Sequence, residues 1–125
     1  MHEAALAEPL LRLVLEECER HATERNTRLK VTRVLVRAGV LMAVEAPTLR
    51  GIFAIMAEGT PAEGAELAVE THPMTGLCPD CASAGRKAEV SVTGRNFHCP
   101  CCGNKNVDWQ GGNELYIASL SVQGE

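Results

Sequence analysis

Two pairs of cysteines constrain this chain more than any other feature of its sequence. The first pair lies in Cys78-Pro79-Asp80-Cys81, and the second follows seventeen residues later in Cys99-Pro100-Cys101-Cys102. Two C-x₂-C pairs with a spacer of this length are typical of tetrahedral zinc sites. Each pair forms a tight turn that places two thiolates on one ion, and the proline and glycine residues around the pairs suit such turns.

The spacing also selects the ligands. Cys99 and Cys102 repeat the spacing of the first pair, so the predicted structural Zn(II) site consists of Cys78, Cys81, Cys99 and Cys102. Cys101 occupies a middle position of the second knuckle as a possible auxiliary thiol. Four thiolates leave no open position on the ion, so we expect no catalysis there. A redox dithiol is the alternative, and it fits less well because we expect neither pair at a strand-to-helix junction.

The segment around these pairs differs in composition from the rest of the chain. Residues 74–112 hold five of the six cysteines and few side chains that could form a core. A segment of roughly 40 residues of this kind cannot offset its conformational entropy by burial, and a bound metal supplies the missing folding free energy. We therefore predict a zinc-binding domain at 74–112, inserted into a domain formed by residues 1–73 and 113–125.

Outside the insert, hydrophobic periodicity predicts two helices and three strands. The helices are residues 4–24, with a buried stripe through Leu13, and a second one opened by Glu45-Ala46-Pro47, with a buried face through Met56, and ended by Gly59. The strands are residues 29–36, 66–71 and 114–122. The predicted fold class is α+β: a small mixed three-stranded sheet packed with two helices, carrying an inserted zinc-ribbon-like module of two cysteine knuckles.

Composition excludes several classes of function. The formal net charge is -4 and no cluster of Lys and Arg is present, which argues against binding of a phosphate backbone. No apolar run approaches the roughly 20 residues of a membrane span, and His2 and Glu3 interrupt any secretory signal. We expect a cytoplasmic, reducing location, in which disulfides are not the default role of cysteine.

Several short motifs, taken in order, resemble the HypA/HybF family of nickel-incorporation proteins. They are Met1-His2-Glu3, a helix with Leu10-Leu11, a strand leading to Gly39, Val44-Glu45-Ala46-Pro47, the paired cysteines and Gly112-Asn113-Glu114-Leu115. The resemblance runs the whole length of the chain. It departs from the family at Ala5, where serine is frequent, and at Cys101, which is an extra cysteine.

The resemblance implies a Ni(II) site built from Met1, His2, Glu3 and Glu45. A free α-amine and the imidazole of His2 are nitrogen ligands that suit nickel, and deprotonated amides of His2 and Glu3 complete a near-planar site. The alternative for the first residues is a frayed terminus, and for Glu45 it is capping of the second helix. His98, next to a predicted zinc ligand, is an auxiliary candidate or a plain turn histidine.

The function implied is metal delivery without catalysis. The family's expected partners are a HypB-type GTPase and the precursor of the hydrogenase large subunit, with urease as a further client, and we expect a monomer or weak homodimer. A zinc-ribbon module that binds protein or nucleic acid is the alternative from another class. An enzyme is disfavoured because no nucleophile, base and orienting group are evident in the sequence.

Overall fold

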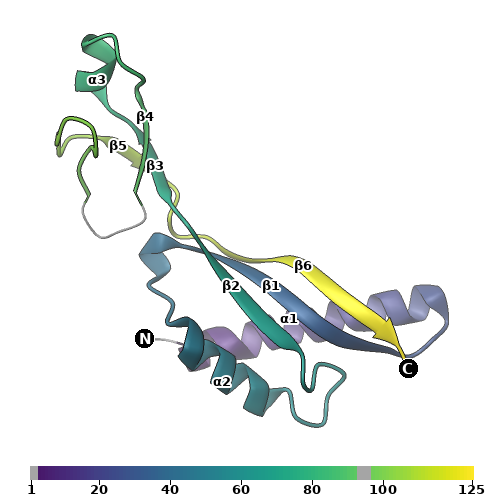
Figure 1. Ribbon diagram of the computed structural model, residues 1–125. Coiled ribbons are helices and arrows are strands. Elements are labelled where there is room, and N and C mark those ends of the chain that lie inside the picture. The colour runs from purple at the N-terminus through teal and green to yellow at the C-terminus, as the bar shows by residue number, and fades with distance from the viewer. Residues whose placement is uncertain (1–2, 93–96) are drawn as a thin grey trace. The chain divides into compact units, whose positions relative to one another are not determined.

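The computed structural model describes residues 3–92 and 97–125, which form two compact units (Figure 1). The first unit comprises residues up to 37, 44–70 and 116–125, and the second comprises residues 38–43 and 71–115. Three α-helices and two three-stranded sheets occur in the described residues, which confirms the predicted α+β class. None of the described helices combines the length and hydropathy that a membrane crossing requires.

The first unit packs two helices with one sheet. Helix α1 (Glu3–Arg25) and helix α2 (Ala46–Met56) contact each other, and the sheet has the strand order β2 (Glu66–His72), β1 (Leu29–Gly39), β6 (Leu115–Gly124). Helix α1 ends before a residue with left-handed backbone, and α2 carries its proline in the first turn. The core of this unit is aliphatic apart from one aromatic ring: Ala7, Leu10, Leu11, Val14, Cys18, Leu29, Val31, Val34, Val36, Leu49, Phe53, Ala57, Ala62 and Leu67.

Two residues assigned to buried faces are exposed instead. Leu13 is 50% exposed and Met56 is 37% exposed. The buried stripe of α1 runs through Leu10, Leu11 and Val14, and Leu13 lies about 100° around the helix from Val14 because each residue rotates by that angle. The prediction of a buried Leu13 was wrong because a three- or four-residue spacing also fits a neighbouring stripe.

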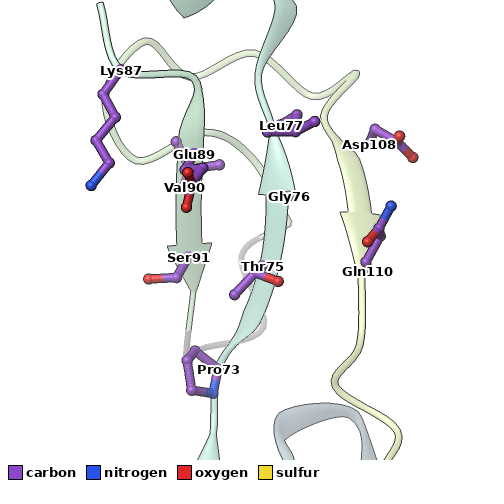
Figure 2. A pocket seen from close by; sticks show the side chains of 10 residues that line it. All are labelled: Pro73, Thr75, Gly76, Leu77, Lys87, Glu89, Val90, Ser91, Asp108 and Gln110. Carbon is purple, nitrogen blue, oxygen red and sulfur yellow. The ribbon is translucent and has the colours of Figure 1, made fainter.

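The second unit is a small antiparallel sheet with a short helix. Strand β3 (Met74–Leu77) is central, with β4 (Glu89–Val92) on one side and β5 (Asp108–Gln110) on the other, and helix α3 (Pro79–Ser83) follows β3. Side chains alternate between the two faces of this sheet, and Figure 2 shows the outward row that includes Thr75 and Leu77. These strands were not predicted, because runs of three or four residues are too short to show a period of two.

A close approach of two glycines also lies within the second unit. The Gly39 N–H donates to the Glu114 carbonyl oxygen at 2.7 Å, and the Leu41 N–H donates to the Gly112 carbonyl oxygen at 2.6 Å. A Cβ on Gly39 would lie 2.2 Å from the carbonyl carbon of Gly112, so only glycine fits there. Gly112 itself has a φ of 85°, which also favours glycine.

Candidate metal centre

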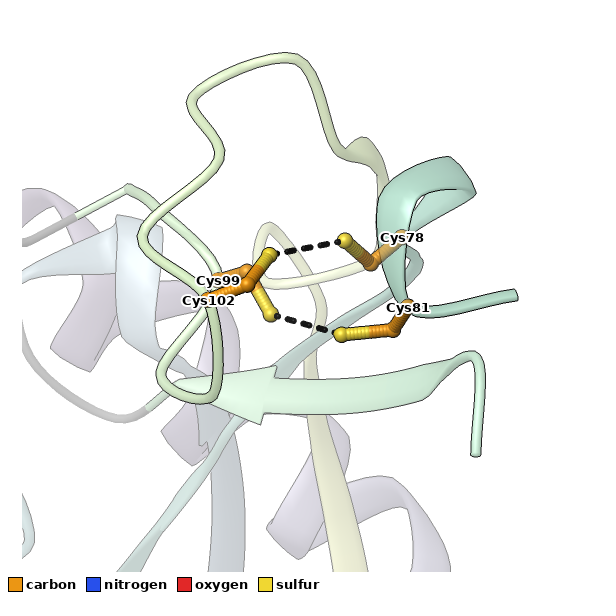
Figure 3. A group of neighbouring side chains, drawn as sticks. All are labelled: Cys78, Cys81, Cys99 and Cys102. Carbon is orange, nitrogen blue, oxygen red and sulfur yellow. Dashed lines mark hydrogen bonds between the residues drawn. The ribbon is translucent and has the colours of Figure 1, made fainter. Parts of the chain in front are cut away.

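Four cysteine side chains converge in the second unit (Figure 3). Their sulfur atoms all lie within 4.8 Å of one another. The Cys78 and Cys102 Sγ atoms are 3.5 Å apart, and the Cys81 and Cys99 Sγ atoms are 3.7 Å apart. A tetrahedral ion with metal–sulfur bonds of about 2.3 Å requires sulfurs about 3.8 Å apart. The donor atoms therefore match a closed tetrathiolate metal site, formed by the four residues that the sequence predicts as zinc ligands.

The backbone around each pair holds the thiols in place. Cys78 precedes the first turn of α3, and its carbonyl oxygen accepts the Ala82 N–H at 3.1 Å. In the second pair, the Cys99 carbonyl oxygen accepts the Gly103 N–H at 2.8 Å, and Gly103 has a φ of 77°. Each pair is thus closed by a tight turn, and the positive φ of Gly103 explains the glycine that follows the second pair.

One local feature differs from expectation. Strand β3 ends at Leu77 and helix α3 begins at Pro79, so Cys78 does lie at a strand-to-helix junction. The expectation that neither pair lies at such a junction was therefore wrong. The helix has five residues, too few to be visible as periodicity in the sequence. The tetrathiolate interpretation now depends on the meeting of all four sulfurs, which a single redox dithiol does not require.

Neighbouring groups strongly shift the pKa values of Cys99 and Cys81. The N–H groups of Cys102 and Cys101 lower the pKa of Cys99 to about 6. Arg86 lowers the pKa of Cys81, but burial and the three neighbouring thiols outweigh this effect and raise that pKa to about 12. Four thiols this close cannot all ionise without a cation, because like charges repel and burial disfavours each of them. A bound divalent ion removes this conflict, and it favours release of the remaining protons.

Arg86 and Asn104 lie beside the cluster, and a role for neither was predicted from the sequence. The guanidinium of Arg86 interacts with the Cys81 thiol, which raises the pKa of Arg86, and its backbone N–H donates to the Cys81 carbonyl oxygen at 2.8 Å. The Asn104 carbonyl oxygen accepts the Cys99 N–H at 2.8 Å, and its side-chain amide lies 4.0 Å from the Cys78 sulfur.

The cluster also belongs to the hydrophobic core of its unit. Its buried members are Cys78, Cys81, Cys99 and Val107, with Val90 and Trp109 packed against them. So few apolar side chains bury too little surface to hold a unit of this size together. The residues present therefore fit a structural metal, whose bonds to the cysteines supply folding free energy.

The two auxiliary candidates lie beside the cluster rather than in it. Cys101 is exposed and is absent from the group of four sulfurs that converge. His98 is half-buried and directly precedes Cys99 in the chain. A role for either residue in binding metal stays a prediction.

At the other predicted site, the structure brings two of the four residues together. Glu3 opens helix α1 and is only 5% exposed, and its carboxylate accepts the Glu45 backbone N–H at 3.0 Å. This hydrogen bond is the main reason that the pKa of Glu3 falls to about 2. Met1 and His2, the other two residues of the predicted nickel site, lie outside the described residues.

Glu45 sits at the N-cap position of α2 by its backbone but does not cap the helix with its side chain. Its carboxylate instead accepts the Thr48 hydroxyl at 2.9 Å and is exposed. One of the orphan N–H groups of this helix start, that of Glu45, is satisfied by Glu3, from a different helix. The sequence carried no signal for that pairing across 42 positions.

Comparisons with known proteins agree over almost the whole chain. A model of the family described as "Hydrogenase/urease nickel incorporation, metallochaperone, hypA" matches residues 1–122. The chain is 36% identical over 123 residues to the hydrogenase maturation factor HypA of Aquifex aeolicus, covering 98% of both chains, and 36% identical to HypA of Chloroflexus aurantiacus, covering 98% and 99%.

A solved structure is similar as well. The solution structure of the Ni metallochaperone HypA from Helicobacter pylori aligns over 100% of both chains with a TM-score of 0.58 and 26% identity. Members of this family are metallochaperones and maturation factors rather than enzymes. The chain, with its four-cysteine metal site, belongs to the HypA family of hydrogenase and urease nickel-incorporation metallochaperones.

Proposed function

We propose that this chain binds one Ni²⁺ through its first residues and delivers it for the maturation of a nickel–iron hydrogenase, with urease as a further client. The observation that carries this proposal is the family match over residues 1–122. That match includes both the Met1-His2-Glu3 start and the four clustered cysteines. We assign Zn²⁺ to the tetrathiolate site, because four thiolates with a tetrahedral arrangement suit that ion.

The nickel ligands in this proposal are the amine of Met1, the imidazole of His2 and the deprotonated amides of His2 and Glu3. Helix α1 begins at Glu3, so the Glu3 amide is in a first turn, where helix geometry provides no carbonyl four residues earlier. Two deprotonated amides offset the charge of Ni²⁺. The loaded site therefore adds no net positive charge at the positive end of the helix dipole.

The Glu3 carboxylate has a different task in this proposal. It is already engaged by the Glu45 N–H at 3.0 Å, so we assign it to hold the starts of α1 and α2 together. The exposed Glu45 carboxylate can turn toward a cation at the cost of its hydrogen bond from Thr48. A hydrogen bond of that kind makes a net contribution of only about 1 kcal/mol, so the Glu45 side chain can reorient at small cost.

Delivery requires acceptors, and we assign these to a HypB-type GTPase and the precursor of the hydrogenase large subunit, in the cytoplasm. Ligands at a chain end can be lost one at a time to an incoming acceptor. Acidification protonates the amine and the imidazole, so the proposed site releases nickel as the pH falls below about 7.

The direct test is a nickel titration of zinc-loaded protein, followed by absorbance. We compare the native start with a chain that carries one extra residue ahead of Met1, and His2→Ala with His21→Ala. His21 is a matched control because it lies on α1 near Glu17 and Glu24, at 3.7 and 3.8 Å. We expect the extension and His2→Ala to abolish binding and His21→Ala to retain it. Nickel binding that survives the extension unchanged contradicts the proposed site.

The spectrum of the loaded protein provides a second readout. Nitrogen-bound Ni²⁺ in a planar site absorbs differently from octahedral Ni²⁺. A planar spectrum with unchanged zinc content supports the assignment of the two ions to two separate sites. Displacement of zinc by nickel at the cysteines contradicts it.

A further inference from the structure

The outward face of the β4-β3-β5 sheet is open and hollowed. The hollow has a volume of about 470 Å³, and Figure 2 shows the side chains that line it. Its floor is the row of residues that alternates with the row packed against the cysteines: Thr75, Leu77, Glu89, Ser91, Asp108 and Gln110. Neither the tetrathiolate site nor the proposed nickel site includes any of these residues.

The strand register arranges these side chains in two rows. Leu77 lies opposite Glu89 on one neighbouring strand and opposite Asp108 on the other. Thr75 lies opposite Ser91 and Gln110 in the same way. Directly opposed residues are close enough to interact. One row is therefore an apolar side chain between two carboxylates, and the other row consists of three neutral hydrogen-bonding groups.

The carboxylates of this face lack the partners that carboxylates have on the other sheet. There, Glu66 and Glu70 on β2 pair with arginines of the adjacent strand at 3.2 and 3.1 Å. Among the described residues, Glu89 and Asp108 take part in no ion pair, although Lys87 borders the same hollow. Leu77 occupies the central position from which an arginine could pair with both carboxylates, and it is 51% exposed.

We propose that this face docks a basic segment of a protein partner. An apolar side chain of that segment packs on Leu77, and the flanking Arg or Lys residues pair with Glu89 and Asp108. The hydroxyls of Thr75 and Ser91 and the amide of Gln110 then bind the backbone of the segment. A nucleic acid does not fit, because the two carboxylates repel phosphate and Lys87 is the only cation that lines the hollow in the described part of the chain.

The test uses three acetylated, amidated peptides of the sequences Gly-Arg-Ile-Arg-Gly, Gly-Arg-Ser-Arg-Gly and Gly-Glu-Ile-Glu-Gly. Each is titrated into zinc-loaded, ¹⁵N-labelled full-length protein at low salt. We expect the first peptide to shift the amide signals of β3, β4 and β5, the second to bind more weakly and the third not to bind. Salt weakens the first interaction because it depends on charge.

Variants localise the effect. The double charge reversal Glu89→Lys with Asp108→Lys is expected to lower the affinity for the first peptide by about tenfold or more, because attraction becomes repulsion. The neutral pair Glu89→Gln with Asp108→Asn gives an intermediate loss and keeps the side-chain size. Glu58→Lys is the matched control, since this exposed carboxylate lies in the other unit, and we expect it to leave binding unchanged.

Three outcomes overturn the proposal: equal binding of the acidic peptide, an unchanged affinity of the charge-reversed protein, or the same shifts on titration with a thymidine oligonucleotide. Nickel titration of the same variants separates this proposal from the proposed function. We expect the nickel affinity to stay the same in all of them, because none alters Met1, His2 or Glu3.

Discussion

At the scale of single residues, Glu3 is the clearest case of a side chain whose role follows from its surroundings. A carboxylate that is 5% exposed persists in its charged form only if hydrogen bonds replace water. Here the Glu45 N–H provides one at the start of α2. The positive end of that helix dipole adds to the stabilisation. Glu3 therefore links two helix starts through charge as well as geometry.

Because of this charged hydrogen bond, the free energy of unfolding should depend on pH in the acid range. The pKa of Glu3 is about 2 in the folded chain against 4.5 for an unperturbed glutamate, so its contribution is complete above about pH 5. It is lost as the pH falls from about 4.5 toward 2, because the unfolded chain takes up the proton first. Urea unfolding of wild type and Glu3→Gln should give free energies of unfolding that differ at pH 6 and converge at pH 2. A difference that does not change with pH would contradict the charged role.

Arg86 gives a second prediction at this scale. Its guanidinium lies beside the Cys81 thiol and compensates part of the negative charge of a tetrathiolate site. Removing a group that surrounds a metal site in this way weakens metal binding by about 10–100-fold. We expect Arg86→Gln to release zinc faster to a chromogenic chelator. Lys87→Gln is the control: it removes the same charge one position along, and we expect no change in release.

At the scale of elements, the contact of Gly39 with Gly112 holds together two segments of the second unit. Gly39→Ala places a methyl group 2.2 Å from a backbone carbon that cannot move aside cheaply. We expect the hydrogen bonds from the Gly39 N–H to Glu114 and from the Leu41 N–H to Gly112 to break. The free energy of unfolding should then fall by about 1–3 kcal/mol. Denaturant unfolding measures this change.

Gly51→Ala is the contrasting variant. Gly51 lies within α2, and apart from its neighbours and the backbone of its own helix, no described atom lies within 4 Å of the Cβ that alanine would add. Alanine in a helix interior is better than glycine by roughly 0.5–1 kcal/mol, so this variant should stabilise the protein. If Gly39→Ala were as stable as wild type, or more stable, the contact argument for Gly39 would fail.

Elements also show what the sequence could and could not predict. The two long helices and three long strands of the first unit were predictable, because each shows its period over several turns or alternations. The four clustered cysteines were predictable from spacing alone. Strands β3, β4 and β5 were not, since runs of three or four residues are too short to show a period of two. The bond from Glu3 to Glu45 was equally invisible, because it depends on the tertiary packing of α1 on α2.

At the scale of the whole molecule, the two units have different sources of stability. The first has a largely aliphatic core that includes the buried ring of Phe53, and folding can bury this core without any ligand. The second has few buried apolar side chains, and its core cluster is mostly cysteine. The first unit should therefore fold without a metal, whereas the second should need its proposed zinc ion.

Two spectroscopic signals separate the units. Trp109 is the one tryptophan of the chain and packs against the cysteine cluster, so its fluorescence reports on the second unit. Helices α1 and α2, of 23 and 11 residues, both belong to the first unit, whereas α3 has five residues, so far-UV circular dichroism reports mainly on the first.

Removal of zinc with a strong chelator should therefore shift the Trp109 emission to longer wavelength and leave most of the helical signal at 222 nm. Cys78→Ser should reproduce this result without chelator, because three thiolates no longer close the site. Cys101→Ser should behave like wild type, since its exposed thiol is outside the cluster. A helical signal lost together with the tryptophan shift would mean that the first unit depends on the metal as well, and that the two units fold as one.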